Sequence, residues 1–374
     1  MKKCLRLLSI IISIPFLLTG CWDQKIYEEI GFILQVGIES SPDNRLLVSY
    51  TSAVTDPDKR EQTELLFGGV DIVREQREKA IQMSAKALQG GKVQQMVISD
   101  SLAKKGIVNL LEILERDPAN PAIAYVIISE NSPKELFNYS QKLGDKPRPA
   151  FYLHQLVRNN FESAYCPNTS IFDFTRAYFA PGIDPIAPIV KIETEMGKGI
   201  RVDGAALFSG DKLVGKIKPK QTSLLLAMQG KMSQTEYIFT TVGPPKNDSS
   251  GKTGAAVMLT KPKKKINVSI ENDIPKVKIS LAFKGDYDER EYNHIDKKEI
   301  QKEYEELMAK ELKSECMKLL KYTQEVGSDP LGIGNLVRAK HNSFWQKHKW
   351  EEVYKGVSFD VDVSLEIVRY GLIK

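Results

Sequence analysis

The feature that most constrains this fold is an unbroken alternation of apolar and polar residues from Val357 to Ile367. Successive side chains of a β-strand point to opposite faces, so all the apolar residues of this segment fall on one face of a sheet. The segment from Asp296 to Val326 repeats apolar residues at helical spacing, with Lys and Glu on its other side. Neither apolar surface can remain in water alone, so the sequence predicts a long helix packed on a central strand of a sheet. The inward residues of this helix are Ile300, Tyr304, Leu307, Met308, Leu312, Cys316, Leu319 and Leu320.

The first half of the chain interleaves strand and helix patterns as far as Val190. Apolar runs at 32–37 and 45–51 flank turn-forming residues, which predicts a hairpin. Apolar residues recur at helical spacing from Asp71 to Leu88, and Gly90-Gly91 is expected to end that helix. Further strands are predicted at 96–98 and 123–129, and further helices at 107–114, from Pro133 onward and at 151–161.

Beyond Ile192 the pattern changes to short strands. The strands predicted at 202–208 and 212–217 flank Ser209-Gly210-Asp211, a hairpin turn signal, and another strand is predicted at 237–242. We expect an α+β protein with three domains of mixed or antiparallel sheets packed with helices, after a cleaved lipoprotein signal. The expected parts are a signal peptide at 1–20, an N-terminal α+β domain at 21–190, a middle β-rich domain plus linker at 191–250, and a C-terminal α+β domain with the long helix and the closing strand at 251–374.

The N-terminus has the pattern of a secretory signal peptide. Three basic residues precede an apolar run from Leu7 to Leu18, which is shorter than the roughly 20 apolar residues that span a bilayer. The run ends in Leu18-Thr19-Gly20-Cys21, which resembles the lipobox of bacterial lipoproteins. We therefore expect cleavage before Cys21 and a lipid on its thiol, because two acyl chains make a stable anchor. The alternative is an ordinary signal peptide, or an uncleaved anchor, with a chance cysteine.

Composition describes an ordinary folded protein, with 42% hydrophobic and 27% charged residues. Removal of the signal peptide leaves 354 residues, enough for two or three domains, and lowers the formal net charge from +5 to +2. That charge is too near balance to indicate a nucleic-acid partner. Cys166 and Cys316 can form one long-range disulfide or remain two buried thiols, and the sequence leaves both open.

One enzymatic pattern competes with a binding role. Ser101-Leu102-Ala103-Lys104, Ser129-Glu130-Asn131 and Lys252-Thr253-Gly254 resemble, in order, the three boxes of penicillin-binding proteins. Each box is short, Lys252 falls in the expected linker, and the first two boxes are only 28 positions apart. We therefore expect the pattern to be a chance match, with no catalytic residue.

Other motifs indicate no cofactor or metal. Gly251-Lys252-Thr253 resembles the end of a phosphate-binding loop, but Lys246 occupies the position of its first glycine. Gly332 and Gly334 are more typical of a turn between helices than of a dinucleotide site. The histidines lack the spacing of metal ligands, and they are His154, His294, His341 and His348.

Two basic groups and a pair of tryptophans allow two interpretations each. Lys261 to Lys265, and a second group of lysines on the hairpin at 202–217 and just after it, could contact anionic lipid headgroups or form a solvated face. The second group comprises Lys212, Lys216, Lys218 and Lys220. Trp345 and Trp350 could form a partner surface, but packing against the long helix is favoured.

Several blocks of the sequence resemble the C subunits of spore nutrient-germinant receptors, the GerAC-like lipoproteins. The blocks are Gly20-Cys21-Trp22-Asp23 with Ile30-Gly31-Phe32, Leu111 to Pro118, Asp203 to Phe208 with Val214-Gly215, Gly327-Ser328-Asp329-Pro330, Phe344-Trp345 with Trp350, and Arg369-Tyr370-Gly371. They are spread over nearly the whole chain after Cys21.

The resemblance implies a non-enzymatic, lipid-anchored receptor subunit that triggers spore germination in response to nutrients. It would stand on the outer face of the spore inner membrane beside two integral membrane partners, the A and B subunits. Cys21, as the lipidation site, is the only functional position that the resemblance transfers. The alternatives are a transporter substrate-binding lipoprotein and, less favoured, a penicillin-binding-type cell-wall enzyme. Nutrient contact, stoichiometry and the signalling mechanism stay open.

Overall fold

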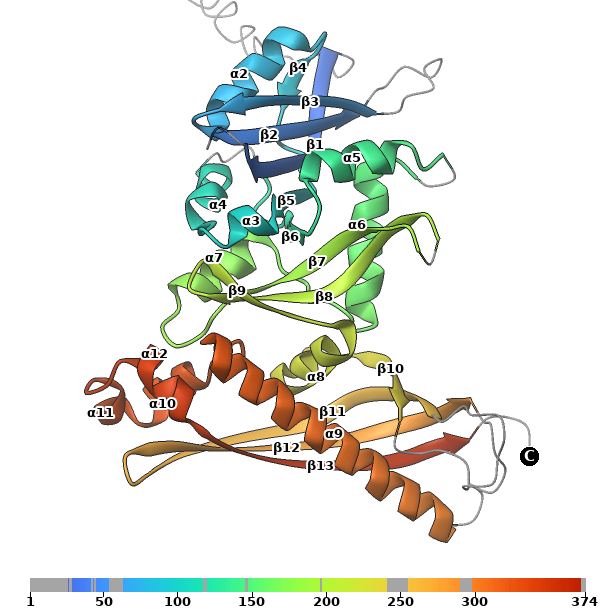
Figure 1. The fold of residues 1–374 in the computed structure, drawn as a ribbon, viewed down its shortest axis with the longest axis vertical. Coiled ribbons are helices and arrows are strands. Elements are labelled where there is room, and N and C mark those ends of the chain that lie inside the picture. The colour runs from blue at the N-terminus through green and yellow to red at the C-terminus, as the bar shows by residue number, and fades with distance from the viewer. Residues whose placement is uncertain are drawn as a thin grey trace, which may run out of the picture.

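Helices and two β-sheets are combined along the whole chain in this computed structural model, which confirms the α+β class (Figure 1). The structure describes residues 26, 29–41, 43, 45–53, 63–116, 120–144, 147–195, 197–240, 255–289 and 298–370. The expected signal peptide, Cys21 and the expected linker at 244–254 lie outside these residues.

Nine strands form the first sheet. They are β1 (Ile30–Ser40), β2 (Leu46–Ala53), β3 (Thr63–Val70), β4 (Ala87–Gln89), β5 (Gln95–Ser99), β6 (Tyr125–Ser129), β7 (Ile186–Glu193), β8 (Gly199–Ser209) and β9 (Lys212–Ile217). Their order is β3-β2-β1-β5-β6-β7-β8-β9, and β4 pairs with β1 outside this path. β1 and β2 pair antiparallel, which confirms the predicted hairpin, whereas β1, β5, β6 and β7 are parallel neighbours. β8 and β9, expected in a middle domain, continue this sheet from β7, and the three-domain division stays a prediction.

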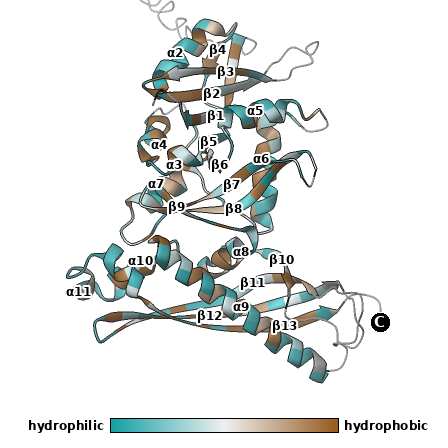
Figure 2. Ribbon diagram, viewed as in Figure 1, coloured by the Kyte–Doolittle hydropathy of each residue, from teal (hydrophilic) through white to brown (hydrophobic). Residues whose placement is uncertain are grey.

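Helices cover both faces of the first sheet (Figure 2). They are α2 (Val73–Met83), α3 (Asp100–Ala103), α4 (Val108–Glu115), α5 (Pro133–Gln141), α6 (Pro149–Glu162) and α7 (Ile171–Phe179). Residues of α2, α3, α4 and α7 share one apolar cluster, and residues of α5 and α6 share another. In β5, Met96 and Ile98 face the first cluster and Val97 faces the second. Strands covered on both faces are apolar without alternation, which is why β5 and β6 read as continuous apolar runs.

The helix predicted from Asp71 to Leu88 is wrong over its last turn. α2 ends at Met83, and Ala87–Gln89 forms β4, which pairs parallel with Ile30–Phe32 at the start of β1. Ala87 and Leu88 continue the helical spacing of apolar residues, so the local pattern does not distinguish the two structures. The partner strand, far away in the sequence, decides between them.

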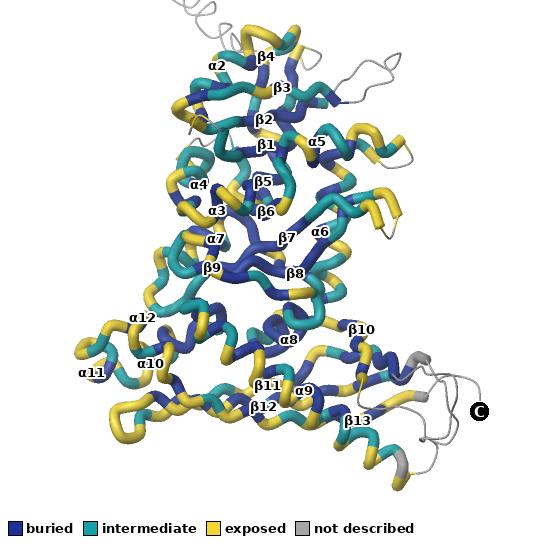
Figure 3. Tube along the Cα trace, in the orientation of Figure 1, coloured by how far each residue is buried: buried dark blue, intermediate teal, exposed yellow. Residues whose placement is uncertain are grey.

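The helix α8 (Pro219–Gln229) lies between the two sheets and is buried along most of its length. Every residue from Thr222 to Met228 is buried, and α8 packs against β8 on one side and against the second sheet on the other. A helix that is buried on all sides has no polar face, so its sequence lacks the amphipathic period that would predict it. Through α8, both sheets contribute to one continuous apolar core (Figure 3).

Four strands form the second sheet, in the order β10-β11-β12-β13. They are β10 (Gln234–Phe239), β11 (Ala255–Glu271), β12 (Ile274–Glu289) and β13 (Ser358–Tyr370). The long helix α9 (Lys298–Val326) packs on the inner face, where Met308, Leu312 and Cys316 are buried, as predicted. The closing strand β13 has the predicted buried face, but among the described strands it pairs with β12 alone and lies at the sheet edge. The predicted central position is therefore wrong.

Short helices connect α9 to β13. They are α10 (Ile333–Lys340), α11 (Asn342–Trp345), α12 (Trp350–Val353) and the 3₁₀ helix η2 (Tyr354–Gly356). Among the helices that the structure describes, none combines the length and apolarity needed to cross a bilayer.

Candidate functional site

The described residues of the penicillin-binding pattern, in its first two boxes, are not assembled into a catalytic group. Ser101 is exposed on α3, and its hydroxyl lies 3.1 Å from the Ser99 hydroxyl. The Lys104 amine is exposed and lies 3.8 Å from Asp100 Oδ2, while Asn131 Oδ1 accepts a hydrogen bond from the Ile192 amide. Lys252 lies outside the described residues. A serine nucleophile needs an adjacent base, and a neighbouring hydroxyl is not one.

Replacing Ser101 with alanine should leave germination unchanged, because the side chain is exposed and its hydroxyl pairs with the Ser99 hydroxyl and not with a base. Spores carrying the variant should lose optical density at the parental rate after addition of the nutrient. Loss of germination with a normally folded protein, or labelling of Ser101 by a fluorescent penicillin, would restore the enzymatic interpretation.

The described histidines and cysteines hold structural positions. His154 stacks on the Tyr125 ring, and His348 lies 3.0 Å from the Phe344 carbonyl oxygen. In the ranges that the structure describes, no group of three or more His, Cys, Asp or Glu residues could hold a metal ion. Cys166 and Cys316 are free, buried thiols, and burial raises the pKa of Cys316 to about 12, so neither is a reactive thiolate.

Three of the four lysines in the second basic group bind carboxylates of this chain rather than remaining free for a lipid surface. Lys216 Nζ lies 2.9 Å from Asp100, the first residue of α3 after β5, and 2.8 Å from Glu130, which follows β6. The other two pairs are Lys218 with Asp203 at 2.6 Å and Lys220 with Glu311 at 3.1 Å. These pairs connect the end of β9 and the start of α8 to both halves of the molecule.

The most elaborate polar arrangement lies where the two sheets meet, and its centre is the buried carboxylate of Asp329. Asp329 Oδ1 accepts a hydrogen bond from the Ile333 amide at 3.0 Å. Oδ2 accepts one from the Gly334 amide at 2.8 Å and one from Trp350 Nε1 at 3.0 Å. The carboxylate therefore caps the start of α10 and fixes the Trp350 ring, which is buried against Gly334 and Tyr354, whereas packing of the tryptophans on the long helix stays a prediction.

A second carboxylate, Asp184, joins this arrangement from the loop before β7. Asp184 Oδ2 accepts a hydrogen bond from the Asp329 amide at 2.7 Å, and its own amide donates to the Asp329 carbonyl at 2.9 Å. Asp184 Oδ1 accepts from the Gly210 amide at 2.8 Å, in the β8–β9 turn. We call Asp184, Asp329 and Trp350 the buried junction, because they connect the first sheet to the C-terminal helices.

Two glycines allow the backbones to meet at the buried junction. The Asn335 amide donates to the Gly182 carbonyl at 2.9 Å. A Cβ on Gly182, whose φ is +75°, would lie 2.5 Å from the Gly334 carbonyl carbon, and one on Gly334 would clash with the Trp350 ring. Any side chain at either position would therefore force the two segments apart.

Burial determines the electrostatics of the junction. It raises the pKa of the Asp329 carboxyl from 3.8 to about 7, and the nearby negative charge of Asp184 acts in the same direction. The donors Gly334, Ile333 and Trp350 act against this rise. Burial also raises the pKa of Asp184, although the amides of Asp329 and Gly210 lower it in part. The junction thus holds a fully buried carboxyl group, Asp329, beside a partly buried one, Asp184.

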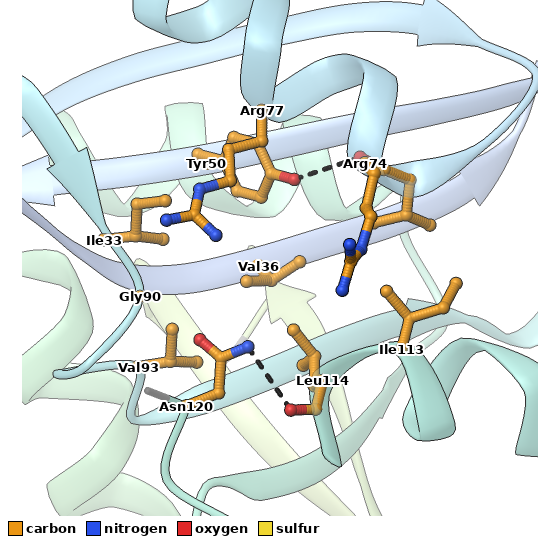
Figure 4. Close-up of a pocket in the computed structure, with 11 residues that line it drawn as sticks. Ile33, Val36, Tyr50, Arg74, Arg77, Gly90, Val93, Ile113, Leu114 and Asn120 are labelled. Atoms are coloured by element: carbon orange, nitrogen blue, oxygen red, sulfur yellow. Dashed lines mark hydrogen bonds between the residues drawn. The ribbon is translucent and has the colours of Figure 1, made fainter. Parts of the chain in front are cut away.

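A small hollow between α2 and α4 has a volume of about 40 Å³ (Figure 4). Ile33, Val36 and Leu114 provide apolar walls, and the side chains of Arg74 and Arg77 lie beside it. This volume holds a few water molecules at most, which excludes a nutrient molecule.

A larger hollow, of about 560 Å³, lies between β1 and the start of α6, and this is the candidate binding site. Such a volume is within the range of roughly 300–1,000 Å³ found for ligand pockets. Its apolar lining residues are Ile30, Phe32, Leu34, Ala53, Val93, Pro121, Ile123, Ala124 and Phe151. Two buried lining atoms, Gln94 Oε1 and His154 Nδ1, have no hydrogen-bond partner among the described residues. Burial lowers the pKa of His154, which favours the neutral ring.

Sequence reasoning found neither the hollow nor the junction. The hollow combines residues from five separate segments, so no local motif marks it. One local pattern could have indicated the junction. Asp329 lies three residues before Gly332-Ile333-Gly334, and an aspartate shortly before an apolar run is typical of a helix start. Asp203, from another quoted block, is tied by ion pairs to Lys218 and Arg201, so this block also has a structural role.

Comparison with known proteins identifies the same family that the sequence blocks resemble. Residues 23–192 match the family described as "Spore germination protein N-terminal domain", and residues 203–371 match "Spore germination B3/ GerAC like, C-terminal". Spore germination protein GerQC of Bacillus cereus is 24% identical over 370 residues and covers 98% of both chains. Spore germination protein B3 of Bacillus subtilis (strain 168) is 21% identical over 379 residues, again with 98% of both chains covered.

The fold agrees as well. The crystal structure of the GerBC protein superposes with a TM-score of 0.54 at 19% identity, over 89% of this chain and 96% of that one. The two matched segments cover nearly all the described residues, one mainly on the first sheet and the other from the end of that sheet through the second. The chain therefore belongs to the GerAC-like family of spore germination proteins, the C subunits of germinant receptors, which are non-catalytic receptor components.

Proposed function

We propose that this chain is a lipid-anchored, non-enzymatic subunit of a membrane receptor complex that triggers spore germination in response to nutrients. The observation that carries the proposal is the family match over both 23–192 and 203–371. The lipobox-like Leu18-Thr19-Gly20-Cys21 directly precedes the first matched segment and supports a lipid on Cys21. The proposed place of the protein is the outer face of the spore inner membrane.

The proposed partners are the two integral membrane subunits of the receptor, A and B. The relatives carry the names of spore germination proteins, and the family resemblance implies such a complex. An affinity-tagged chain purified from mildly solubilised spore membranes should bring down two integral membrane proteins. If the tagged chain is recovered alone, although the same mild solubilisation preserves other membrane complexes, the partner proposal is contradicted.

Replacing Cys21 with alanine should abolish acylation and loosen the retention of the body at the membrane. The physical reason is that the diacyl group is the proposed anchor, and no described helix can span a bilayer. Mass spectrometry of the N-terminal peptide and sedimentation of spore membranes check the two effects. A variant that is still lipid-modified would contradict the assignment of Cys21.

The hollow beside β1 gives specific support to the alternative, a substrate-binding lipoprotein of a transporter. However, transporter-type binding proteins close two similar lobes around a ligand, and here the hollow lies within the nine-stranded sheet and its helices. A radiolabelled nutrient-binding assay on the purified protein distinguishes the two roles. Binding with a defined affinity in the absence of any receptor subunit would favour the transporter role.

A further inference from the structure

The end of the molecule at which β1 begins exposes a surface of unusual composition. β4 pairs with Ile30–Phe32, so the segment leading into β4 lies beside the start of β1. Figure 1 shows the last turn of α2, β4 and the start of β1 together at one end of the long axis, with the second sheet at the other end. From Lys79 to Ser99 the chain contains no aspartate or glutamate.

Apolar side chains in this segment face the solvent. Ile81 is 40% exposed and Met83 is 67% exposed, and Ala85, before β4, and Ala87, its first residue, are exposed as well. Lys92 is exposed just beyond β4, and Lys86 is half-buried before it. We call Ile81, Met83, Lys86 and Lys92 the basic-apolar surface.

Among the residues that the structure describes, three acidic groups border this surface. Glu64 of β3 accepts a hydrogen bond from the Ser84 hydroxyl at 3.4 Å, Glu78 lies five residues before Met83 in α2, and the exposed Glu29 directly precedes Ile30. The combination of exposed apolar side chains with lysines fits the boundary between anionic lipid headgroups and acyl chains.

The length of the tether places this end near the membrane. This step rests on the proposed lipid anchor. Cys21 lies nine residues before Ile30, and an extended chain spans at most about 3.6 Å per residue, so the reach is roughly 30 Å or less. The surface next to Ile30 is therefore held close to the bilayer at all times, whereas the second sheet lies at the far end of the molecule.

We propose that the basic-apolar surface rests on anionic lipid, with Ile81 and Met83 at the level of the headgroups. The body then stands on its N-terminal end, and the second sheet points away from the membrane. The lysines add an attraction that depends on anionic lipid and weakens with salt.

The test uses the full lipid-modified chain in vesicles of phosphatidylcholine with or without phosphatidylglycerol. Met83→Cys carries an environment-sensitive fluorophore, and Phe179→Cys is the matched control, because Phe179 on α7 is 64% exposed but lies outside this end. The native thiols Cys166 and Cys316 are buried and should not react. The label at position 83 should shift to shorter wavelength and be quenched by brominated lipid, more strongly with phosphatidylglycerol, and the label at 179 should do neither.

The possible results test the lipid anchor and the orientation of the body on the membrane separately. A chain that carries no acyl group and still floats with vesicles would contradict the proposed anchor. A lipid-modified chain that floats, but whose label at 83 behaves like the label at 179, would overturn the orientation alone. A label at 83 that shifts only in the assembled receptor in detergent would assign this surface to a protein partner, which also overturns the proposal. Lys86→Glu combined with Lys92→Glu should remove the dependence on phosphatidylglycerol.

Discussion

Replacing Val361 with aspartate should unfold the C-terminal half of the protein at temperatures at which the parent stays folded. Val361 is 0% exposed on the inner face of β13, in the core that includes Leu312 and Cys316 of α9. A carboxylate there has no partner in the apolar core, and an uncompensated buried charge costs roughly 3–5 kcal/mol. Domains are stable by only about 5–15 kcal/mol, so the loss is a large share of the total.

The measurement is the free energy of unfolding of the purified protein by denaturant titration, followed by circular dichroism. Ser358→Asp is the matched control, since it adds the same carboxylate to the outer face of the same strand, opposite Lys276 of β12. The control should unfold close to the parent. Equal destabilisation by the two substitutions would remove burial as the cause.

Replacing Asp329 with asparagine should make the protein less stable by an amount that depends on pH. The folded pKa of Asp329, about 7, lies above its ordinary value of 3.8, so the folded state binds the extra proton between these values. The stability that this proton contributes is fully present below pH 4 and is lost as pH rises through 7. A rise of this size corresponds to about 4 kcal/mol at most. Asparagine binds no proton and lacks the contribution.

The difference in unfolding free energy between parent and Asp329→Asn should therefore be largest near pH 4 and shrink toward pH 8. It should not vanish there, because asparagine has a single acceptor oxygen and cannot replace both Oδ2, which binds Gly334 and Trp350, and Oδ1, which binds Ile333. At least one buried donor is left unpaired, at a cost of about 1–3 kcal/mol. Asp360→Asn, an exposed carboxylate on β13, is the control and should follow the parent. Parallel curves for parent and Asp329→Asn would show that Asp329 does not take up the proton.

The buried junction explains why two of the quoted sequence blocks are structural rather than catalytic. Gly327-Ser328-Asp329-Pro330 supplies the carboxylate that caps α10 and meets Asp184. In the block that begins at Asp203, Gly204 has a φ of +109°, and a Cβ there would clash with the Ile217 carbonyl of β9. Both blocks lie where segments distant in the sequence approach closely, which is where few residue types fit.

Of all the features described, the candidate binding site was the hardest to predict from the sequence, and it was found from the tertiary structure. Phe32 and Ile123 could be assigned to predicted strands, and Phe151 to a predicted helix, from local spacing alone. That they line one hollow follows from the pairing of β1 with β5 and of β5 with β6, and from the packing of α6 on that sheet. Pairing partners are set by the whole core, and no residue spacing within a single segment encodes them.

The sequence by itself determined the elements whose patterns are local. The alternation at 357–367 places one face of β13 in the core, and the helical period to Val326 yields α9, because side-chain direction follows directly from backbone period. Only the tertiary structure decided the edge position of β13, the strand β4 and the helix α8. β4 exists because Ile30–Phe32 pairs with it, and α8 because two sheets bury it from both sides. In each case the deciding contacts come from residues far away in the chain, and the free energy of burying apolar surface outweighs the local preference.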